Sequence, residues 1–396
     1  MYKTPQTLAE LFSKAGKKPI IKSDDDARYQ HRNEIIEYFY QILVTDRYKY
    51  LACFYEAYFQ FKDPRTLSWS GVSLSIKNPI FDAPVISLQK NDASRRIIRN
   101  LFHLELLHLT KVTNTVKSRV SFWESLLNLY NRFELEDRFF APSSIGLFLR
   151  EKGTQREKRS GIREINYNNL FYLFQAYQPK ASIFNPYAIK WILSDILPAG
   201  KTIFTPVLSW GSYLTAYMHV SSYTHYVGVD VMPTVCQKCE FLAQWYRDLD
   251  AQFQHKRTEM ICTPSESLNN NFLSKFRNYF DTILICPPYY DMEIYHEGQQ
   301  SISLYPDYKT WLTKYWEATV KACQRVCKTG GTFAVIANDY HTLDKKSYPL
   351  TSDLDRITSQ YFTFKNKYYL QNRTSPLRVN AKDRTERLYV YTNGHD

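Results

Sequence analysis

The chain has 396 residues, of which 44% are hydrophobic and 23% are charged. This length allows two domains with cores of their own, and we expect two. No apolar run approaches the roughly 18 residues of a membrane span, which argues against a membrane protein. The N-terminal sequence "MYKTPQTLAELFSKAGKKP" has no apolar core of the signal-peptide type. We therefore expect an intracellular protein, cytoplasmic or, in a eukaryote, nuclear.

The net charge of +12 and the aromatic content of 16% suit a surface that binds phosphates and stacks bases. A nucleic acid is therefore the expected partner, although a soluble basic protein without such a partner has the same composition. Seven cysteines without framework spacing predict free thiols in a reducing compartment. Cys236 and Cys239 form a C-x-x-C, but no second Cys or His pair completes a zinc site, so no metal is expected.

The N-terminal part of the chain is predicted to be mainly helical. Apolar residues at three- and four-residue spacing indicate two helices within residues 26–62 and another in "SFWESLLNLYNRFELEDRFF". Residues 65–90, with Ser, Pro and alternating Val and Ile, favour short strands. Residues 151–163, "EKGTQREKRSGIR", read equally well as a solvated linker and as a phosphate-contacting loop. We predict a domain over 1–163 that contacts nucleic acid or a protein partner, including a second copy of the chain.

Residues 164–396 alternate between strand and helix patterns, which predicts a mostly parallel, doubly wound α/β sheet. The five successive strands are predicted in "KTIFTPVL", "HYVGVDV", "TEMICTP", "DTILICPP" and "GTFAVIAND". The longest intervening helices are "PTVCQKCEFLAQWYRDL" and "YPDYKTWLTKYWEATVKACQRVC". The segments "KYYLQNR" and "ERLYVYTN" predict a closing antiparallel pair.

Ligands of such sheets bind beyond the carboxyl ends of the strands, so the residues that follow each strand are the candidates for a site. Ser209 and Gly211 follow the first strand and can form a tight turn. Asp230 ends the second strand, where a carboxylate can accept hydrogen bonds from ribose hydroxyls or cap the next helix. Ser265 and Glu266 follow the third strand and can meet an adenine edge or begin a helix.

The fourth strand ends in Cys286-Pro287-Pro288-Tyr289. Two prolines fix φ and remove two N–H donors, so that the carbonyls of the turn can accept from an amino group. A tyrosine beside them offers a flat face to a planar base. Such a corner can hold an exocyclic amine in line with an electrophilic methyl group, although a strand that simply ends in a Pro-Pro turn has the same pattern.

The segment "ICPPY" resembles the (Asp/Asn/Ser)-Pro-Pro-(Tyr/Phe) motif of S-adenosylmethionine-dependent amino-methyltransferases, which act on adenine N6, cytosine N4 or related amines. "FNPYAIKWI" is similar to the Phe-x-Pro segment of this family, "TPVLSWGSYL" to its glycine turn, "GVD" to its ribose-binding acid and "KTGGTFAVIAND" to its fifth strand. "RTERLYVY" is similar to the final strand of many DNA members, and the resemblance covers about residues 180–396.

The resemblance implies a Rossmann-like class I methyltransferase fold with S-adenosylmethionine as cofactor. It implies that Cys286 and the Pro287 carbonyl orient the amine, with Pro288 completing the corner and Tyr289 stacking on the base. The implied cofactor residues are Phe184, Pro186, Thr205, Ser209, Gly211, Asp230, Ser265 and Glu266. The sequence departs from the family pattern where Cys286 replaces Asp, Asn or Ser, where Thr205 replaces an acid, and where Ser209 replaces glycine.

The expected substrate is DNA, with the target base flipped into the corner beside Tyr289. Residues 365–387 hold seven Lys or Arg against two acids, which predicts a backbone clamp or, alternatively, a charge-protected sheet edge. The candidate substrate-binding residues are Tyr290, Tyr295, Lys365, Lys367, Arg373, Arg378, Lys382 and Arg384. Two alternatives remain open: the same reaction on RNA, and a catalytically silent subunit that binds nucleic acid.

Overall fold

The computed structural model describes residues 72–75, 82–88, 98, 101–102, 109–111, 183–292, 294–295, 298–341, 347–372 and 385–394. The chain forms two compact units, residues 1–60 with 103–181 and residues 61–102 with 182–396. In the first unit only the short strand β3 (Leu109–Lys111) is described. The helices predicted within 26–62 and 121–140, and the predicted boundary at 163, lie outside the described residues.

Nine of the described strands form one mixed sheet, in the order β1-β2-β12-β13-β9-β7-β4-β5-β6. Its parallel part consists of β4 (Thr202–Thr205), β5 (His225–Asp230), β6 (Arg257–Cys262), β7 (Phe280–Ile285) and β9 (Cys327–Ala337). The antiparallel strand β13 (Glu386–Thr392) lies between β9 and β12 (Thr363–Asn372). The result is the predicted doubly wound α/β fold of Rossmann-like type, with its C-terminal antiparallel pair.

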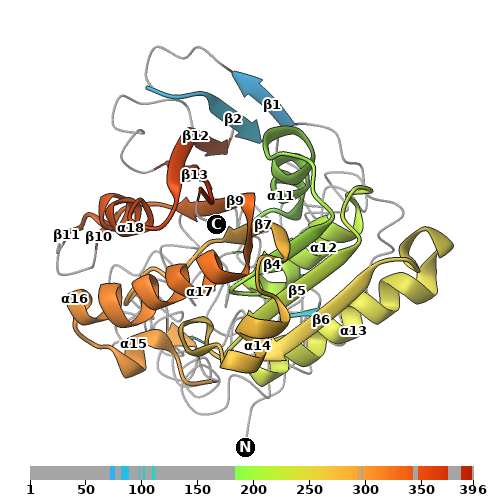
Figure 1. Ribbon diagram of the computed structural model, residues 1–396, viewed down its shortest axis with the longest axis horizontal. Helices are drawn as coiled ribbons and strands as arrows, with labels where there is room; N and C mark the ends of the chain where they lie inside the picture. Colours follow the sequence, from blue (N-terminus) through green and yellow to red (C-terminus); the bar gives the residue numbers. More distant parts are fainter. Residues whose placement is uncertain are drawn as a thin grey trace, which may run out of the picture. The chain divides into compact units, whose positions relative to one another are not determined.

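The strands β1 (Val72–Ser75) and β2 (Val85–Leu88) extend the same sheet (Figure 1). They form an antiparallel pair, and β2 runs parallel to β12 with Tyr369 beside Val85. Short strands within residues 65–90 were predicted, and these two confirm them. Their pairing with a strand almost 300 residues later joins an N-terminal stretch to the C-terminal sheet.

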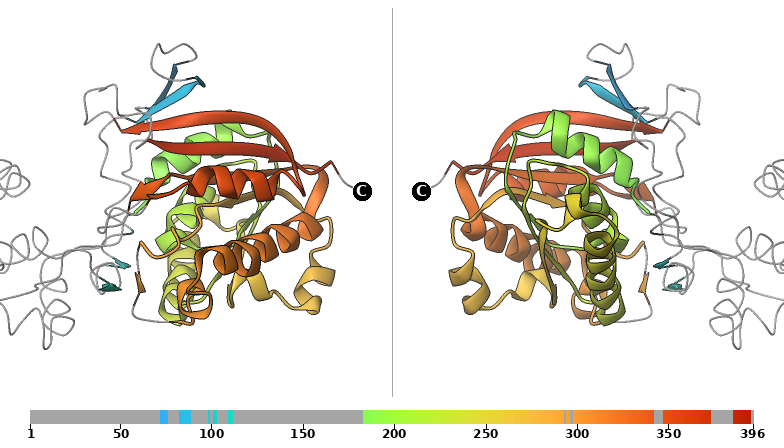
Figure 2. Two further views of the ribbon diagram at one scale, coloured as in Figure 1. Left: turned by 90° about the vertical axis from the view of Figure 1, so that its left-hand side faces the viewer. Right: turned by 90° about the vertical axis from the view of Figure 1, so that its right-hand side faces the viewer.

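Helices cover both faces of the sheet (Figure 2). One face carries α11 (Pro186–Trp191), α12 (Ser212–Met218) and α13 (Pro233–Leu249). The other carries α14 (Asn270–Lys275), α17 (Ala318–Val326) and α18 (Leu350–Thr358). Shorter elements are α15 (Ser301–Leu304), α16 (Tyr308–Trp311), β8 (Ile294–Tyr295), β10 (Tyr340–His341) and β11 (Ser347–Tyr348). The π-helical segment η8 (Leu312–Glu317) joins α16 to α17, so the predicted long helix is continuous.

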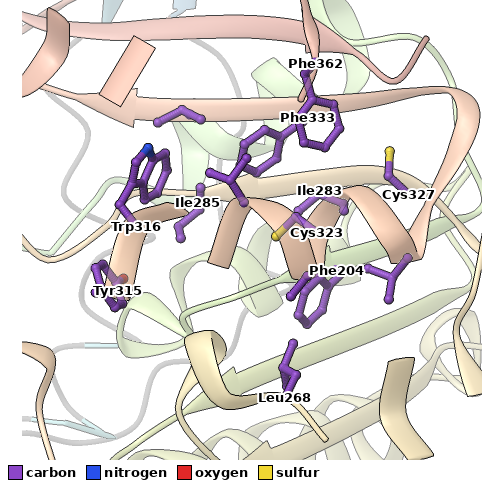
Figure 3. Close-up of a cluster of buried hydrophobic side chains, with 14 of the residues drawn as sticks. Phe204, Leu268, Ile283, Ile285, Tyr315, Trp316, Cys323, Cys327, Phe333 and Phe362 are labelled. Carbon is purple, nitrogen blue, oxygen red and sulfur yellow. The ribbon is translucent and has the colours of Figure 1, made fainter. Parts of the chain in front are cut away.

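The core under α17 and α18 contains mainly aromatic and branched side chains (Figure 3). Ile283 and Ile285 of β7 and Phe333 of β9 are fully buried there, as is Trp316. Strands with both faces covered are expected to be continuous apolar runs, and the last parts of β7 ("ILI") and β9 ("FAVIA") have that composition. Because side chains alternate along a strand, Leu284 of β7 points to the opposite face, toward α11 and α12.

Candidate functional site

The parallel strands β4, β5, β6 and β7 all end on the same side of the sheet. We call this side, where the C-terminal ends of these strands lie, the carboxyl edge. Asp230 lies beside Cys262 there, at the ends of β5 and β6. The strand order reverses direction between β4 and β7, so that the chain segments after these two strands diverge. Such a reversal is the usual ligand position in doubly wound sheets. The predicted cofactor and catalytic segments are thereby brought to one place.

The turn after β4 is a short 3₁₀ segment, η5 (Ser209–Gly211), in an uncommon backbone conformation. Ser209, Trp210 and Gly211 have φ values of 47°, 55° and 73°, all in the left-handed region. A left-handed residue other than glycine costs about 1–2 kcal/mol, so this turn holds strain at two positions. A Cβ on Gly211 would lie 3.3 Å from carbons of Leu242 and Phe102. Glycine is therefore required here by both conformation and packing.

Asp230 braces the turns after β4 and β5. Its Oδ2 accepts a hydrogen bond from the amide of Leu208 at 3.2 Å, and its Oδ1 accepts from the amide of Met232 at 3.1 Å. The N-cap residue of α13 is Met232, so Asp230 does not cap that helix itself. Two carboxylate oxygens have about four acceptor positions, and these two amides bind one position on each oxygen.

Thr205 is fully buried, and its hydroxyl hydrogen-bonds the hydroxyl of Tyr226 on β5. The position where the family pattern has an acid is therefore used here for contact between two strands. Because the Thr205 hydroxyl faces the protein interior, a ligand at this turn would be contacted by neighbouring residues instead.

The Phe184 and Pro186 segment lies against the start of α12. Pro186 is the first residue of α11, and Asn185 caps that helix by accepting from the amide of Tyr187 at 3.1 Å. The carbonyl of Phe184 accepts from the Ser212 hydroxyl at 2.8 Å. This bond ties the predicted Phe-x-Pro segment to the residue that follows Gly211.

Ser265 and Glu266 belong to a 3₁₀ turn, η7 (Ser265–Ser267), after β6. The Ser265 hydroxyl lies 3.1 Å from that of Thr319 on α17, and burial raises the pKa of Glu266. Near them is the buried hydroxyl of Tyr315, whose pKa is raised by burial and by Glu266 and lowered by a hydrogen bond with Ser265.

The Cys286–Tyr289 corner follows β7 directly. Pro287 is buried, Tyr289 is half-buried, and the Sγ of Cys286 lies 3.9 Å from the Tyr289 hydroxyl. The Pro288 carbonyl accepts from the amide of Tyr290 at 3.0 Å. Among the described residues no donor reaches the Pro287 carbonyl, which is the oxygen predicted to receive an amine.

Sequence reasoning missed two side chains beside this corner. Tyr213 of α12 is fully buried, and its hydroxyl lies near the backbone of Cys286 and the side chain of Ser209. Glu386, the first residue of β13, lies near Tyr289. Burial raises the pKa of Tyr289 well above its usual value, and Cys286, Glu386 and Tyr213 raise it further. The predicted sheet with its closing antiparallel pair indicates where Glu386 lies, because a last strand that is antiparallel to β9 begins at the carboxyl edge.

The structure separates the two secondary tyrosines. Tyr290 is buried against Tyr308, Trp311 and Tyr348 and donates to the carbonyl of Pro306, so its side chain belongs to the core and does not line the corner as predicted. The reason is the φ of 47° at Tyr290, which turns the side chain inward.

Tyr295 lies at the site through its contact with the turn after β4. Its ring meets that of Trp210 edge-on, with centroids 5.3 Å apart. Gln300 fixes its backbone, because the Gln300 side chain accepts from the Tyr295 amide at 3.0 Å and donates to its carbonyl at 2.6 Å. A Cβ on Gly298 would lie 2.3 Å from the Val231 carbonyl oxygen. The segment after the corner therefore crosses to the turns after β4 and β5.

Two of the six predicted basic residues are described, and both lie on β12. Lys365 is exposed near the start of β12, and Lys367 forms an ion pair with Asp82 at 3.3 Å. The remaining four, Arg373, Arg378, Lys382 and Arg384, lie outside the described residues. The strand positions that flank them, Leu370 and Glu386, are paired in register and lie at the carboxyl edge.

Within the described residues no group of three or more His, Cys, Asp or Glu is arranged to hold a metal ion. Cys236 and Cys239 are both buried, and the Cys236 thiol lies 3.7 Å from the Asp230 carbonyl. A search of the same described residues finds no helix long and apolar enough to cross a membrane.

No protein-family model matches the sequence, and no curated protein matches it. Among solved structures, the chain is similar to the N-methyltransferase NodS of Bradyrhizobium japonicum WM9 with S-adenosyl-L-homocysteine, at 11% identity over 52% of this chain and 85% of that chain, with a TM-score of 0.34. A predicted O-methyltransferase, Atu636 of Agrobacterium tumefaciens, is 10% identical over 54% and 82%, with a TM-score of 0.36. An rRNA methylase of Streptococcus thermophilus is 14% identical over 54% and 100%, with a TM-score of 0.32. These similarities are distant, and the fold rests on the strand order and register of the chain itself.

Proposed function

We propose that this chain is an S-adenosylmethionine-dependent methyltransferase that modifies the exocyclic amine of a DNA base, adenine N6 or cytosine N4. The observation that carries the proposal is the position of the Cys286–Tyr289 corner. It follows β7 at the carboxyl edge, beside β4, where the strand order reverses. Ligands of doubly wound sheets bind at that position, and the corner has the acceptor and aromatic groups that an amine target needs.

The chain's own residues fit the cofactor. Asp230 would accept from ribose hydroxyls while it holds the amides of Leu208 and Met232. The Tyr315 hydroxyl, Ser265 and Glu266 would meet the adenine, and the turn at Gly211 would lie along the methionine part. When bound, S-adenosylmethionine supplies an electrophilic methyl group on a sulfonium.

The Pro287 carbonyl would accept one N–H of the target amine, since no other described donor reaches it. Tyr289 would stack on the base and fix its plane. Because duplex DNA does not expose an amine to such a corner, the base would be flipped out of the helix. The net charge of +12 favours DNA binding, and the basic residues 373–384 would bind the DNA backbone.

A catalytically silent nucleic-acid-binding subunit is the second candidate. The burial of Thr205 against Tyr226 favours it, because no acid stands at the first turn. Calorimetry separates the two: no binding of S-adenosylmethionine at millimolar concentration, with DNA binding intact, would support the silent subunit.

The decisive experiment incubates the protein with methyl-labelled S-adenosylmethionine and with DNA and RNA in parallel, followed by mass analysis of the nucleosides. Label in N6-methyladenine or N4-methylcytosine of DNA is the expected result, and label in RNA alone would move the proposal to an RNA substrate.

The Tyr289→Ala variant should abolish transfer while cofactor affinity changes less than about threefold, because stacking on the base is lost. Tyr289→Phe is the matched control, since it keeps the ring. Equal loss of transfer and of cofactor binding in Tyr289→Ala would contradict the stacking role.

A further inference from the structure

The corner has a weak acceptor where an oxygen is expected. A thiol accepts hydrogen bonds poorly, whereas Asp, Asn and Ser at the same position would present an oxygen. The Pro287 carbonyl can accept one of the two N–H groups of an amine, and the second needs another acceptor. A carboxylate from elsewhere in the fold would meet that need, and Glu386 is near Tyr289.

Strand register brings Glu386 to the corner. Ile285 of β7 pairs with Val335 of β9, and Ala337 of β9 pairs with Arg387 of β13. The residues just after β7, the last residue of β9 and the first of β13 therefore lie side by side at the carboxyl edge. Neighbouring strands are about 4.8 Å apart, which separates the backbones of the corner and Glu386 by roughly 10 Å. Glutamate and tyrosine side chains together span such a distance.

The alternation of side chains gives Glu386 and Cys286 the same face of the sheet. Tyr389 and Tyr391 of β13 pack in the core under α17 and α18, and Arg387 donates to Thr351 of α18 at 2.7 Å. Glu386, one residue before Arg387, then points to the opposite face. Cys286, one residue after the core side chain Ile285, points the same way.

The electrostatic environment of Tyr289 agrees with this placement. Burial is the main cause of its raised pKa, and the neighbouring Cys286 and Glu386 raise it further. The Tyr289 hydroxyl lies 3.9 Å from the Cys286 thiol. The Cys286 thiol, the Tyr289 phenol and the Glu386 carboxylate thus form one cluster where β7 ends and β13 begins.

We infer that Glu386 is the carboxylate of the proposed methyl-transfer site and takes the proton that the target amine loses. In this step the amine nitrogen forms a bond to the methyl carbon while the carbon–sulfur bond breaks and its electron pair stays on sulfur. The nitrogen becomes cationic, and one N–H proton passes to the Glu386 carboxylate, which later releases it to water. The inference rests on the proposed function and adds the acceptor that Cys286 does not provide.

The test compares Glu386→Gln with Glu386→Asp and with Glu240→Gln, an exposed position on α13. Glu386→Gln keeps the shape and removes the charge, so kcat for DNA methylation should fall at least about tenfold, as for the loss of a general base. Glu386→Asp should recover part of the rate. Glu240→Gln should match the wild-type protein.

A binding measurement gives a second readout that needs no turnover. Sinefungin is a cofactor analogue with an ammonium group at the methyl position, whereas S-adenosylhomocysteine has no charge there. Glu386→Gln should weaken sinefungin binding about fivefold through the lost attraction and leave S-adenosylhomocysteine binding within twofold. A kcat within twofold of wild type, or equal effects on the two analogues, would overturn the role of Glu386. A wild-type protein that binds neither analogue would instead refute the proposed function.

Discussion

Asp230 joins two turns with one side chain, so its contribution is structural before any ligand arrives. Its two oxygens accept from Leu208 on one side and Met232 on the other. Hydrogen bonds to a charged group are worth about 1.5–3 kcal/mol. The turn that carries Ser209, Trp210 and Gly211 is strained and begins directly after Leu208. The Asp230 carboxylate therefore holds in position the residue that directly precedes the strained turn.

The Asp230→Asn variant tests this double role. An amide has only one acceptor oxygen, so one of the two backbone amides loses its partner, and cofactor affinity should fall at least about tenfold. Isothermal calorimetry with S-adenosylhomocysteine measures the effect. Asp195→Asn, at an exposed position after α11, is the control and should bind normally. Unchanged affinity in Asp230→Asn would remove Asp230 from the site.

His219 follows α12 and makes stability depend on pH. Burial lowers its pKa from 6.5 to about 3, with Lys190 and Lys256 contributing, and its ring packs edge-on against Tyr246 and Phe253. Below pH 6.5 the unfolded histidine binds a proton that the folded one resists until about pH 3. The stability is therefore complete above pH 6.5 and is lost as the pH falls toward 3, by at most about 1.4 kcal/mol per pH unit.

The His219→Gln variant should lose less stability than wild type between pH 7 and pH 4, because this proton uptake is removed. Urea unfolding at three pH values across that range gives the comparison. His255→Gln, at an exposed position, should keep the wild-type slope. Parallel slopes for His219→Gln and wild type would contradict the assignment.

At the residue scale, the site residues that could be predicted from the sequence are those that directly follow a strand. Asp230, Ser265 and Cys286 follow strands that composition alone identifies, so their location at one edge could be expected. Tyr213 could not be assigned in this way, since its nearness to Cys286 depends on the packing of α12, and the nearness of Glu386 to Tyr289 required the register of β13 as well. The inward turn of Tyr290 depends on a single backbone angle.

At the scale of elements, α12 is fixed at both ends. Its first residue, Ser212, donates to the Phe184 carbonyl, and at its last turn the buried Lys256 ammonium donates to the carbonyl of Tyr217 at 3.5 Å and, beyond the helix, to that of Val220 at 2.6 Å. Carbonyls at the end of a helix lack partners within the helix, and a cation satisfies them well. The turn before α12 is thereby held between a fixed helix and β4.

Gly211→Ala should destabilise the protein more than Gly330→Ala. Both glycines have similar positive angles, 73° and 76°, but only Gly211 has neighbours within 4 Å of an added Cβ. The conformational cost of about 1 kcal/mol is shared, and crowding by Leu242 and Phe102 should add at least about 1 kcal/mol at Gly211. Chemical denaturation of the two variants gives the difference directly. Equal losses would show that Leu242 and Phe102 make room for the methyl group.

The positions of the strands could be predicted from the sequence better than the pairing between strands. Alternation and β-branched runs located β4, β5, β7 and β13 because each is a local pattern. That β2 pairs with β12 could not be read from either strand, since pairing is a tertiary contact between distant segments. The start of β12 at Thr363, before the predicted "KYYLQNR", has the same origin, because its first residues are exposed and pair with β13.

At the scale of the whole molecule, the sheet has two edges with different roles. The segments after β4, β5 and β7 lie at the carboxyl edge, as do the paired positions Leu370 and Glu386 that flank residues 373–384. Lys201 and Arg277, which precede β4 and β7, lie at the opposite edge and are exposed. A net charge of +12 attracts nucleic acid to any part of the surface, but only cations at the carboxyl edge can position a base at the corner.

The double variant Arg378→Ala/Lys382→Ala should therefore weaken DNA binding in a salt-dependent manner. Each lost phosphate contact reduces the slope of log K against log salt by about 0.9, so two contacts should reduce it by about 1.8. Lys201→Ala/Arg277→Ala removes the same charge from the opposite edge and should leave the slope within about 0.5 of wild type. Fluorescence anisotropy of a labelled duplex between 50 and 200 mM salt, a range of about fourfold, measures both. If the two double variants reduce the slope equally, the effect belongs to net charge, and residues 373–384 are not the backbone clamp.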